Sequence, residues 1–339
     1  MLKKFLLAIA AFILFCLLVV AGYVAYISAT WQKDYSAIEK PAIQASTDPE
    51  VIKRGEYVAH ALAHCSICHA PLEATMNRKP GDRPAMPGGF EWKMGPVGTL
   101  YSRNITPDNE TGIGAWTDGE LARAIKWGIG KDGKALTFMV FSAPALADED
   151  LLAVVSYLRS TAPVKQQNKP HDVGFLGKWM ASLAGPDFRK PFFEGLKYAP
   201  PAAEPSIERG AYLARGPAAC IGCHSPFDMM SMKVSGAEFS GNTQAEPDKD
   251  DENMVYRIPN LTPDPKTGHI AKWDEESFVK RFQAGRVYKS SKMPWEAFRE
   301  MSDADMRSVY RYLKTLPPAV HYVGASHRPA SEDPEKDPR

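Results

Sequence analysis

A five-residue motif, Cys-x-x-Cys-His, occurs twice in this chain of 339 residues. This motif is the attachment signature of c-type haem. Two thiols spaced three residues apart at the start of a helix can each form a thioether with one porphyrin, and the adjacent histidine can then give an imidazole nitrogen to the iron. The sequence therefore predicts two covalently bound haem c groups. The residues that would bind them are Cys65, Cys68, His69, Cys220, Cys223 and His224.

Paired cysteines have two other interpretations, a thioredoxin-like redox motif and a zinc site. Neither requires a histidine directly after the second cysteine, and neither explains why the flanking sequence is repeated. The chain has 5 cysteines, and the one outside the motifs, Cys16, lies in a long apolar run. The rest of the chain therefore offers no further cysteine as a thiolate ligand or nucleophile, and haem remains the favoured interpretation.

The sequence around each motif also recurs, and the offset between matching residues stays between 155 and 157. The corresponding segments are Arg-Gly-x-Tyr at 54–57 and 209–212, Asn-x-Thr-Pro-Asp at 104–108 and 260–264, and Asp-x-Asp followed by Tyr-Leu at 148–158 and 303–313. A unit that recurs at a fixed spacing indicates a duplicated domain. We therefore predict two copies of one domain.

Each copy has the pattern of a helical domain. Thr117 and Glu120 form a capping box, which predicts a helix start, and Gly55 would let a second helix approach closely. No stretch alternates well enough to predict a substantial sheet, so the predicted fold class is all-α. The predicted divisions are a transmembrane anchor at 1–30, a tether at 31–50, a first haem-binding domain at 51–163, an interdomain strap at 164–205, a second haem-binding domain at 206–320 and a disordered tail at 321–339.

The N-terminal part is a membrane-span candidate. Residues 5–27 carry no charge and follow Lys3 and Lys4. At about 1.5 Å per residue, such a helix crosses a hydrocarbon core of about 30 Å. The run is longer than the apolar region of a signal peptide and lacks a small-x-small cleavage site, so we expect a retained single-pass anchor. The lysines would keep the N-terminus in the cytoplasm and place the remainder on the periplasmic side of a bacterial inner membrane.

The sixth ligand of each iron decides between electron transfer and catalysis, because methionine closes the iron whereas an open position suits catalysis. Met293 lies on a loop before the last helix of the second copy, and Met139 occupies the same stretch of the first. These two are the distal-ligand candidates. His60 and His64 precede the first motif and are expected at the surface. Other methionines keep the assignment open, namely Met86, Met94, Met229, Met230 and Met232.

These repeated motifs resemble the class I cytochrome c domain. The tandem form is similar to the membrane-anchored cytochrome subunits of bacterial alcohol and gluconate dehydrogenases over about residues 50–320, although those subunits usually carry three haems and an anchor elsewhere. The resemblance implies His69 and His224 as proximal ligands and Met139 and Met293 as distal ligands. It implies partners that are redox proteins.

A formal net charge of +1 gives no indication of a nucleic-acid partner. We expect a dihaem electron-transfer protein that links a periplasmic or membrane dehydrogenase, or a quinol-oxidising complex, to a soluble cytochrome or a terminal oxidase. The alternative is a dihaem enzyme, a peroxidase or a protein like thiosulfate dehydrogenase, with an open distal site on the first haem.

Overall fold

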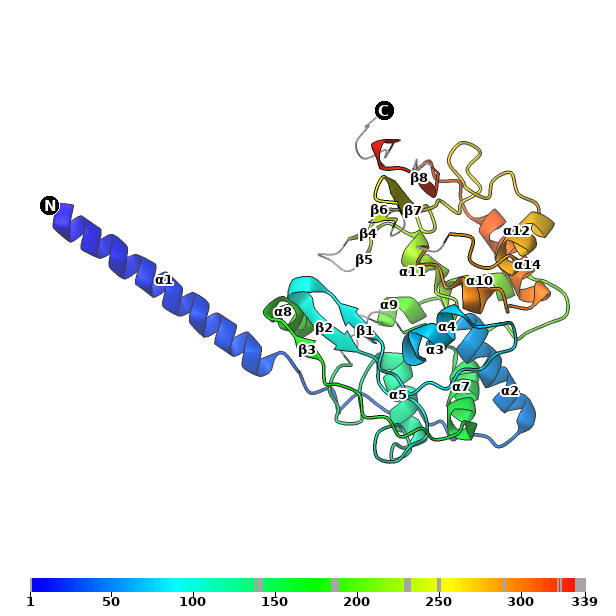
Figure 1. Ribbon diagram of the computed structural model, residues 1–339, viewed down its shortest axis with the longest axis horizontal. Helices are drawn as coiled ribbons and strands as arrows, with labels where there is room; N and C mark the ends of the chain where they lie inside the picture. The colour runs from blue at the N-terminus through cyan, green and yellow to red at the C-terminus, as the bar shows by residue number, and fades with distance from the viewer. Residues whose placement is uncertain are drawn as a thin grey trace.

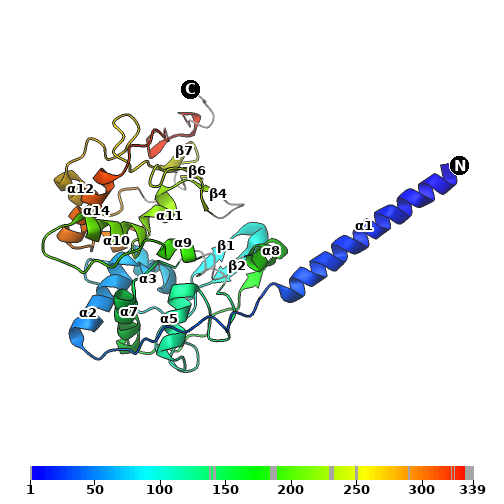
Figure 2. The same ribbon diagram turned by 180° about the vertical axis from the view of Figure 1, so that it is seen from behind.

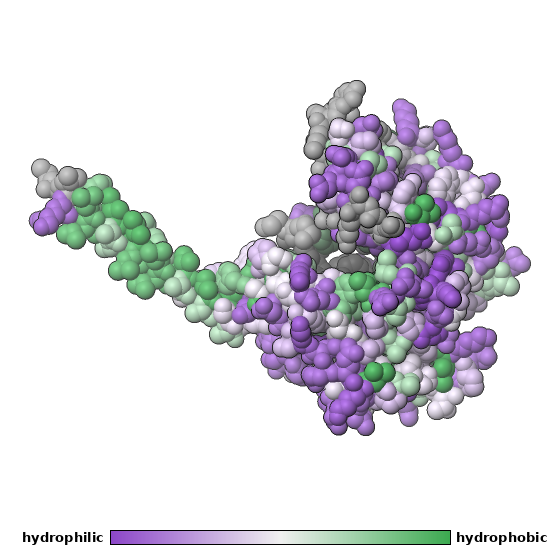
Figure 3. All heavy atoms as spheres, viewed as in Figure 1, coloured by the Kyte–Doolittle hydropathy of each residue, from purple (hydrophilic) through white to green (hydrophobic). Residues whose placement is uncertain are grey.

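The computed structural model describes residues 2–136, 139, 143–183, 189–228, 233–248, 251–288, 291–321, 323 and 325–332. A long N-terminal helix, α1 (Leu2–Thr30), extends away from a body that contains the remaining elements (Figures 1 and 2). It is the one helix among the described residues that is long and apolar enough to cross a membrane. Signal sequences near an N-terminus share this length and apolar composition. Figure 3 shows its apolar surface exposed along most of its length.

The body holds two sets of helices that correspond through the sequence repeat. The first set comprises α2 (Pro49–Tyr57), the π-helix η1 (Val58–Leu62), α3 (Cys65–His69), α4 (Leu72–Met76), α5 (Asp118–Trp127) and α7 (Asp148–Ser160). The second set comprises α10 (Ile207–Arg215), α11 (Cys220–His224), α12 (Glu275–Gln283), α13 (Trp295–Phe298) and α14 (Asp303–Thr315). The segment between the sets contains α8 (Phe175–Leu183) and α9 (Lys190–Phe193). The predicted capping box at Thr117 is confirmed.

The same helix pair forms the centre of each repeat. α2 packs against α7, and α10 packs against α14. A Cβ atom added at Gly55 would overlap the carbonyl oxygen of Ala153, and one added at Gly210 would overlap that of Ser308. The glycines therefore permit the close approach of the two backbones, as predicted for Gly55. Buried apolar side chains of both repeats form one continuous cluster.

The fold is mainly helical, but it also contains short antiparallel strands that the all-α prediction missed. They are β1 (Glu91–Lys93), β2 (Gly98–Tyr101), β3 (Asp172–Val173), β4 (Phe227–Asp228), β5 (Lys233–Val234), β6 (Asn242–Pro247), β7 (Met254–Ile258) and β8 (His327–Pro329), with two 3-10 turns, η2 (Gly95–Val97) and η4 (Ala330–Glu332). They pair as β1-β2-β3, β4-β5 and β6-β7-β8. Strands this short, in loops rich in glycine and proline, give almost no alternating pattern, which explains the omission.

Two further expectations differ from the structure. In the tail expected to be disordered, residues 327–329 form β8, which pairs with β7, and the Nε2 of His327 donates to the carboxylate of Asp248 at 2.9 Å. Main-chain pairing needs no apolar pattern, so composition gave no sign of it. The strap helix α8 packs against α1, η2 and β2. The predicted interdomain strap at 164–205 thus places α8 against the anchor helix and the first repeat, and not between the two repeats.

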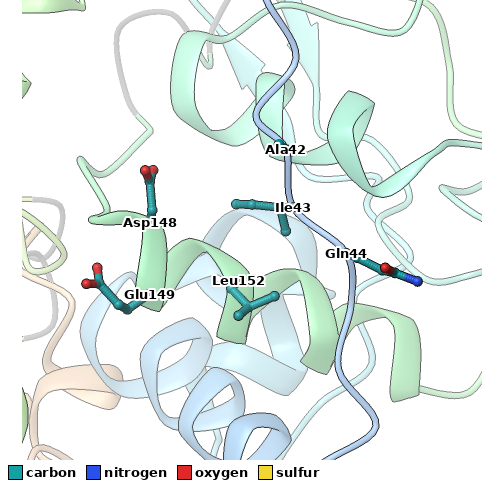
Figure 4. A pocket seen from close by; sticks show the side chains of 6 residues that line it. All are labelled: Ala42, Ile43, Gln44, Asp148, Glu149 and Leu152. Carbon is teal, nitrogen blue, oxygen red and sulfur yellow. The ribbon is translucent and has the colours of Figure 1, made fainter.

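The expected tether lies against the first repeat. The amide of Ala45 donates to Asp118 at 2.8 Å, the amide of Ser46 donates to Ser156 at 2.8 Å, and Lys40 pairs with Glu120 at 3.1 Å. A surface pocket lies between this segment and the start of α7 (Figure 4) and contains none of the predicted site residues. Its lining residues are Ala42, Ile43, Gln44, Asp148, Glu149 and Leu152.

Candidate functional site

Each Cys-x-x-Cys-His motif forms a one-turn helix, α3 or α11, that begins after a sharp change of backbone direction. The residue before the first cysteine is in the left-handed region in both, with φ of 43° at His64 and 49° at Ala219. Positive φ is unusual for residues other than glycine, and here it recurs at the same place in both repeats. The cysteines are unpaired. This geometry places both thiols and the histidine on one short turn, as haem attachment requires.

The histidine of each motif is oriented by a backbone carbonyl. His69 Nδ1 lies 2.8 Å from the carbonyl oxygen of Arg103, and His224 Nδ1 lies 3.0 Å from that of Pro259. A carbonyl oxygen can only accept, so Nδ1 carries the proton and Nε2 is the nitrogen available to a metal. Such a bond fixes the ring orientation and raises the basicity of a ligating imidazole.

The Asn-x-Thr-Pro-Asp turn positions this carbonyl. Asn104 Oδ1 accepts from the amide and the hydroxyl of Thr106, at 2.9 Å and 2.7 Å, and its Nδ2 donates to the carbonyl of Val164 at 2.8 Å. Asn260 makes the same bonds to Thr262 and Ala319. The residue that orients each histidine directly precedes this asparagine in the sequence. Through the bond to Val164 or Ala319, the asparagine is in turn held by the segment that follows the last helix of its repeat. Such a turn could instead donate hydrogen bonds to a haem propionate. The side chain of its asparagine already bonds within the protein, however, so a structural role for the turn is favoured.

The backbone carbonyl of each distal-ligand candidate accepts a hydrogen bond from an arginine. The guanidinium of Arg286 donates to the carbonyl of Met293 at 3.2 Å and pairs with Glu296 at 2.6 Å. In the first repeat the arginine comes from the segment between the repeats. Arg189 is fully buried and donates to the carbonyl of Met139 at 3.5 Å. Arg189 was missed by sequence reasoning, because nothing at the corresponding repeat position indicates it.

Arg189 also donates to three carbonyls that precede or follow Met139 in the sequence. It donates to Lys126 at 2.7 Å, to Ala143 at 2.9 Å and to Pro144 at 3.2 Å. Burial lowers the pKa of this guanidinium to about 10. A fork of five donors satisfies several carbonyls at once, which an ammonium group cannot do with the same geometry. The two methionine side chains are half-buried.

The thiols favour the haem interpretation over zinc. Burial raises the pKa of Cys65 to about 12, that of Cys68 to about 11 and that of Cys220 to about 12. Zinc is bound by thiolates, usually as a group of four ligands. In the part of the chain that the structure describes, no cluster of three or more His, Cys, Asp or Glu side chains could hold a metal ion. The two cysteine pairs therefore remain separate sites.

The histidine at position 60 differs from expectation, because its side chain is fully buried and it lies within η1. Its Nε2 lies 2.8 Å from the hydroxyl of Tyr157. Burial, reinforced by the charges of Arg78 and Arg83, lowers the pKa of His60 to about 3. His64 is half-buried and makes an edge contact with Phe298 of the second repeat. Neither histidine is the free surface residue that was expected.

Two attachment helices, each with a carbonyl-oriented histidine, are the arrangement expected of a c-type cytochrome. No protein-family model matches the chain. The chain is 32% identical over 289 residues to the cytochrome c subunit of a quinone-dependent alcohol dehydrogenase from Gluconobacter oxydans, and 30% identical over 285 residues to the cytochrome c subunit of gluconate 2-dehydrogenase from Pantoea cypripedii. It is 27% identical over 296 residues to a diheme cytochrome c-type protein from Cereibacter sphaeroides.

The coverage differs among these relatives. The alignments include 80%, 78% and 80% of this chain, but 55%, 59% and 90% of the respective relatives. The chain therefore spans little more than half the length of the two dehydrogenase subunits. It is a homologue of bacterial dehydrogenase cytochrome c subunits and of a diheme cytochrome c, which confirms the resemblance drawn from the repeated motifs.

Proposed function

We propose that the chain is a membrane-anchored electron-transfer protein with two haem c groups, one in each of two cytochrome c domains at 51–163 and 206–320. The observation that carries this proposal is the pair of attachment helices, each with a histidine that donates Nδ1–H to a carbonyl. The names of the relatives support transfer over the enzyme alternative with an open distal site.

The residues fit the group. Cys65 and Cys68 would bind the first haem and Cys220 and Cys223 the second, with His69 and His224 as proximal ligands. Met139 and Met293 are the proposed distal ligands, and Arg189 and Arg286 donate to their backbone carbonyls. When bound, haem c supplies one-electron transfer, and the protein tunes it through ligands, burial and hydrogen bonds. Arginines bonded to the backbone at both proposed ligands favour transfer, because a backbone held in place need not rearrange between oxidation states.

The proposed location is the bacterial inner membrane. α1 would cross it once, with Lys3 and Lys4 in the cytoplasm and the body in the periplasm. The electron donor would be a periplasmic or membrane dehydrogenase, or a quinol-oxidising complex. The acceptor would be a soluble cytochrome or a terminal oxidase. A dehydrogenase as donor is supported by the similarity to cytochrome c subunits of alcohol and gluconate dehydrogenases.

Haem counting tests this proposal. Purified full-length chain should retain two haems per polypeptide after acid–acetone extraction, and the Cys65→Ser/Cys68→Ser variant should retain one. Cys16→Ser is the matched control, because Cys16 lies outside both motifs. Extraction that removes all pigment would overturn the proposal. Electron transfer itself is tested by co-purification from solubilised membranes and by reduction of the chain when the substrate of the captured dehydrogenase is added. A captured dehydrogenase that fails to reduce the chain would contradict that donor.

A further inference from the structure

The helix α8 presents an apolar face to solvent. At 3.6 residues per turn, Phe175, Leu176, Trp179 and Leu183 lie on one side of this helix. Phe175 is 41% exposed, Leu176 37% and Leu183 70%. The only charged residue of the helix is Lys178. A contiguous exposed apolar face on a helix indicates an interaction surface.

The other side of α8 is held firmly by the first repeat. Gly177 is buried, and a Cβ atom added there would overlap the carbonyl oxygen of Val97 in η2. The amide of Gly174, just before the helix, donates to the same carbonyl at 3.0 Å. η2 connects β1 to β2, so α8 is fixed to a sheet that follows the first haem motif. Its exposed face cannot be covered by folding back onto this sheet.

A hydrogen bond joins α8 to α1 at one position along the α1 helix. The indole Nε1 of Trp179 donates to the hydroxyl of Tyr23 at 3.1 Å, and the C-terminal end of α1 lies next to α8 (Figures 1 and 2). The uncharged run begins at Phe5, and 18 residues of helix reach Tyr23. That distance is about 27 Å, close to the thickness of a hydrocarbon core of about 30 Å.

Tyr23 and Trp179 therefore lie where the far side of a bilayer would end. Tryptophan and tyrosine are enriched at this depth, where an apolar ring meets lipid and its polar atom meets water. Farther along α1, Ile27 is already buried by the protein body, being 6% exposed. The helix thus leaves the bilayer between Tyr23 and Ile27, at the level of α8.

We propose that α8 lies in the periplasmic membrane–water interface, with the Phe175, Leu176, Trp179 and Leu183 face against lipid. This inference rests on the proposed anchoring of the chain by α1. The surface binds a phospholipid bilayer, which takes up apolar side chains at its interface. The consequence is an orientation for the first repeat, because the sheet that carries α8 is thereby held against the membrane.

The test is the reactivity of single cysteines toward a membrane-impermeant maleimide, in full-length haem-containing chain reconstituted in phospholipid nanodiscs. Each cysteine is introduced into the Cys16→Ser variant. Labelling of the Cys16→Ser variant alone is measured and subtracted. Leu183→Cys probes α8, and Val320→Cys is the matched control, because Val320 is an apolar residue of similar exposure, 77%, in the second repeat. Phe12→Cys, 67% exposed on α1, reports the anchor.

We expect labelling of Leu183→Cys and Phe12→Cys to be lost under conditions in which Val320→Cys reacts to completion. Reaction of Leu183→Cys as fast as Val320→Cys, with Phe12→Cys protected, would overturn the placement of α8 and leave the anchor intact. Reaction of Phe12→Cys as fast as Val320→Cys would overturn the anchor, and the placement of α8 with it. A second probe, Leu176→Cys, should follow Leu183→Cys, so that the result does not depend on the end of the helix.

Discussion

The hydroxyl of Tyr57 in the first repeat donates a hydrogen bond of 2.8 Å to the carboxylate of Asp305 in the second. The same relationship exists in reverse, because Tyr212 donates to Asp150 at 2.7 Å. Each carboxylate also pairs with the arginine of its own repeat. The contact between the repeats is therefore self-complementary, like an isologous interface between two copies of one subunit. It would fix the distance between two haems.

Replacing Tyr57 with phenylalanine should destabilise this interface. The ring volume is kept, but Asp305 loses a donor and the amide of Ser302 loses its acceptor at 2.9 Å. Hydrogen bonds to charged groups contribute about 1.5–3 kcal/mol each. Burial and the charge of Asp305 raise the pKa of Tyr57, so its hydroxyl stays a donor over the usual pH range. We expect Tyr57→Phe to lower the free energy of unfolding by about 2 kcal/mol in a denaturant titration.

Tyr198→Phe is the control for this measurement. Tyr198 is half-buried and lies against the ring of Tyr212. No hydroxyl hydrogen bond of Tyr198 lies within the described residues, so its replacement should change stability little. Tyr212→Phe should match Tyr57→Phe. Equal midpoints for the Tyr57 and Tyr198 variants would show that the cross-repeat bond contributes no net stability.

Conservative replacement of the loop arginines should weaken the proposed methionine ligation. Lysine keeps the charge at Arg286 or Arg189, but it cannot donate in a fork to several acceptors at once. The backbone carbonyl of Met293 or Met139 would then lose its guanidinium donor. We expect each variant to lose the part of the red absorption band of methionine-ligated ferric haem that comes from its own repeat, and the double variant to lose the band.

Arg307→Lys is the control for these spectra, because Arg307 joins the acidic residues Asp303, Glu275 and Glu276 and no methionine carbonyl. Its spectrum should match that of the parent. A band of full intensity in both Arg286→Lys and Arg189→Lys would mean that the arginines do not position the ligands.

Sequence reasoning succeeded where the determining contacts are local. The Cys-x-x-Cys-His turns, the capping box at Thr117 and the close approach at Gly55 depend on residues within a few positions or on a single missing Cβ. It could also identify Tyr57 and Asp150 as repeated residues. It could not show that each tyrosine bonds to the carboxylate of the other repeat, because a repeat pattern does not distinguish pairing within a copy from pairing between copies.

The buried Arg189 shows a second reason for failure. The second repeat uses Arg286, ten residues before its partner Glu296, whereas the first takes its arginine from about 50 residues beyond Met139. Each arginine donates to the carbonyl of a distal-ligand candidate, but the two arginines occupy unrelated positions in the sequence, so comparing the repeats cannot reveal Arg189. The strands fail for a similar reason, since β8 depends on main-chain bonds to β7 and on no apolar period.

Loss of the asparagine that orients the histidine carbonyl should affect both stability and the haem. In Asn104→Ala the hydroxyl and amide of Thr106 lose their acceptor, and the carbonyl of Val164 loses a donor. Leaving buried polar groups unsatisfied costs about 1–3 kcal/mol. The bond from His69 to Arg103 should weaken, which makes the imidazole a poorer donor to iron. We expect the reduction potential of the first haem to rise while that of the second is unchanged.

The matched variant is Asn260→Ala, which should shift the second haem and leave the first. A redox titration monitored by optical absorption separates the reduction of the first haem from that of the second. Shifts of the same size at both haems in either single variant would contradict a local effect through the histidine carbonyl.

His60 should make stability fall as the solution becomes acidic. The groups facing it are the hydroxyl of Tyr157 and the guanidinium of Arg78, which donates to the carbonyl of His60, with Arg83 nearby. Burial lowers the pKa of His60 from 6.5 to about 3. Between these values the unfolded chain binds one proton that the folded chain does not. The stabilisation is fully present above about pH 6.5 and declines below it, by up to about 1.4 kcal/mol per pH unit.

The variant His60→Gln keeps a polar side chain beside Tyr157 and removes the titration. Unfolding free energies measured from about pH 7 to about pH 4.5 should fall less steeply for this variant than for the parent, with the curves separating only below about pH 6.5. His171, whose pKa burial lowers to about 4, contributes a similar slope to both proteins and cancels in the difference. Parallel curves would mean that His60 binds its proton equally well in the folded and unfolded states, which would contradict the lowered pKa.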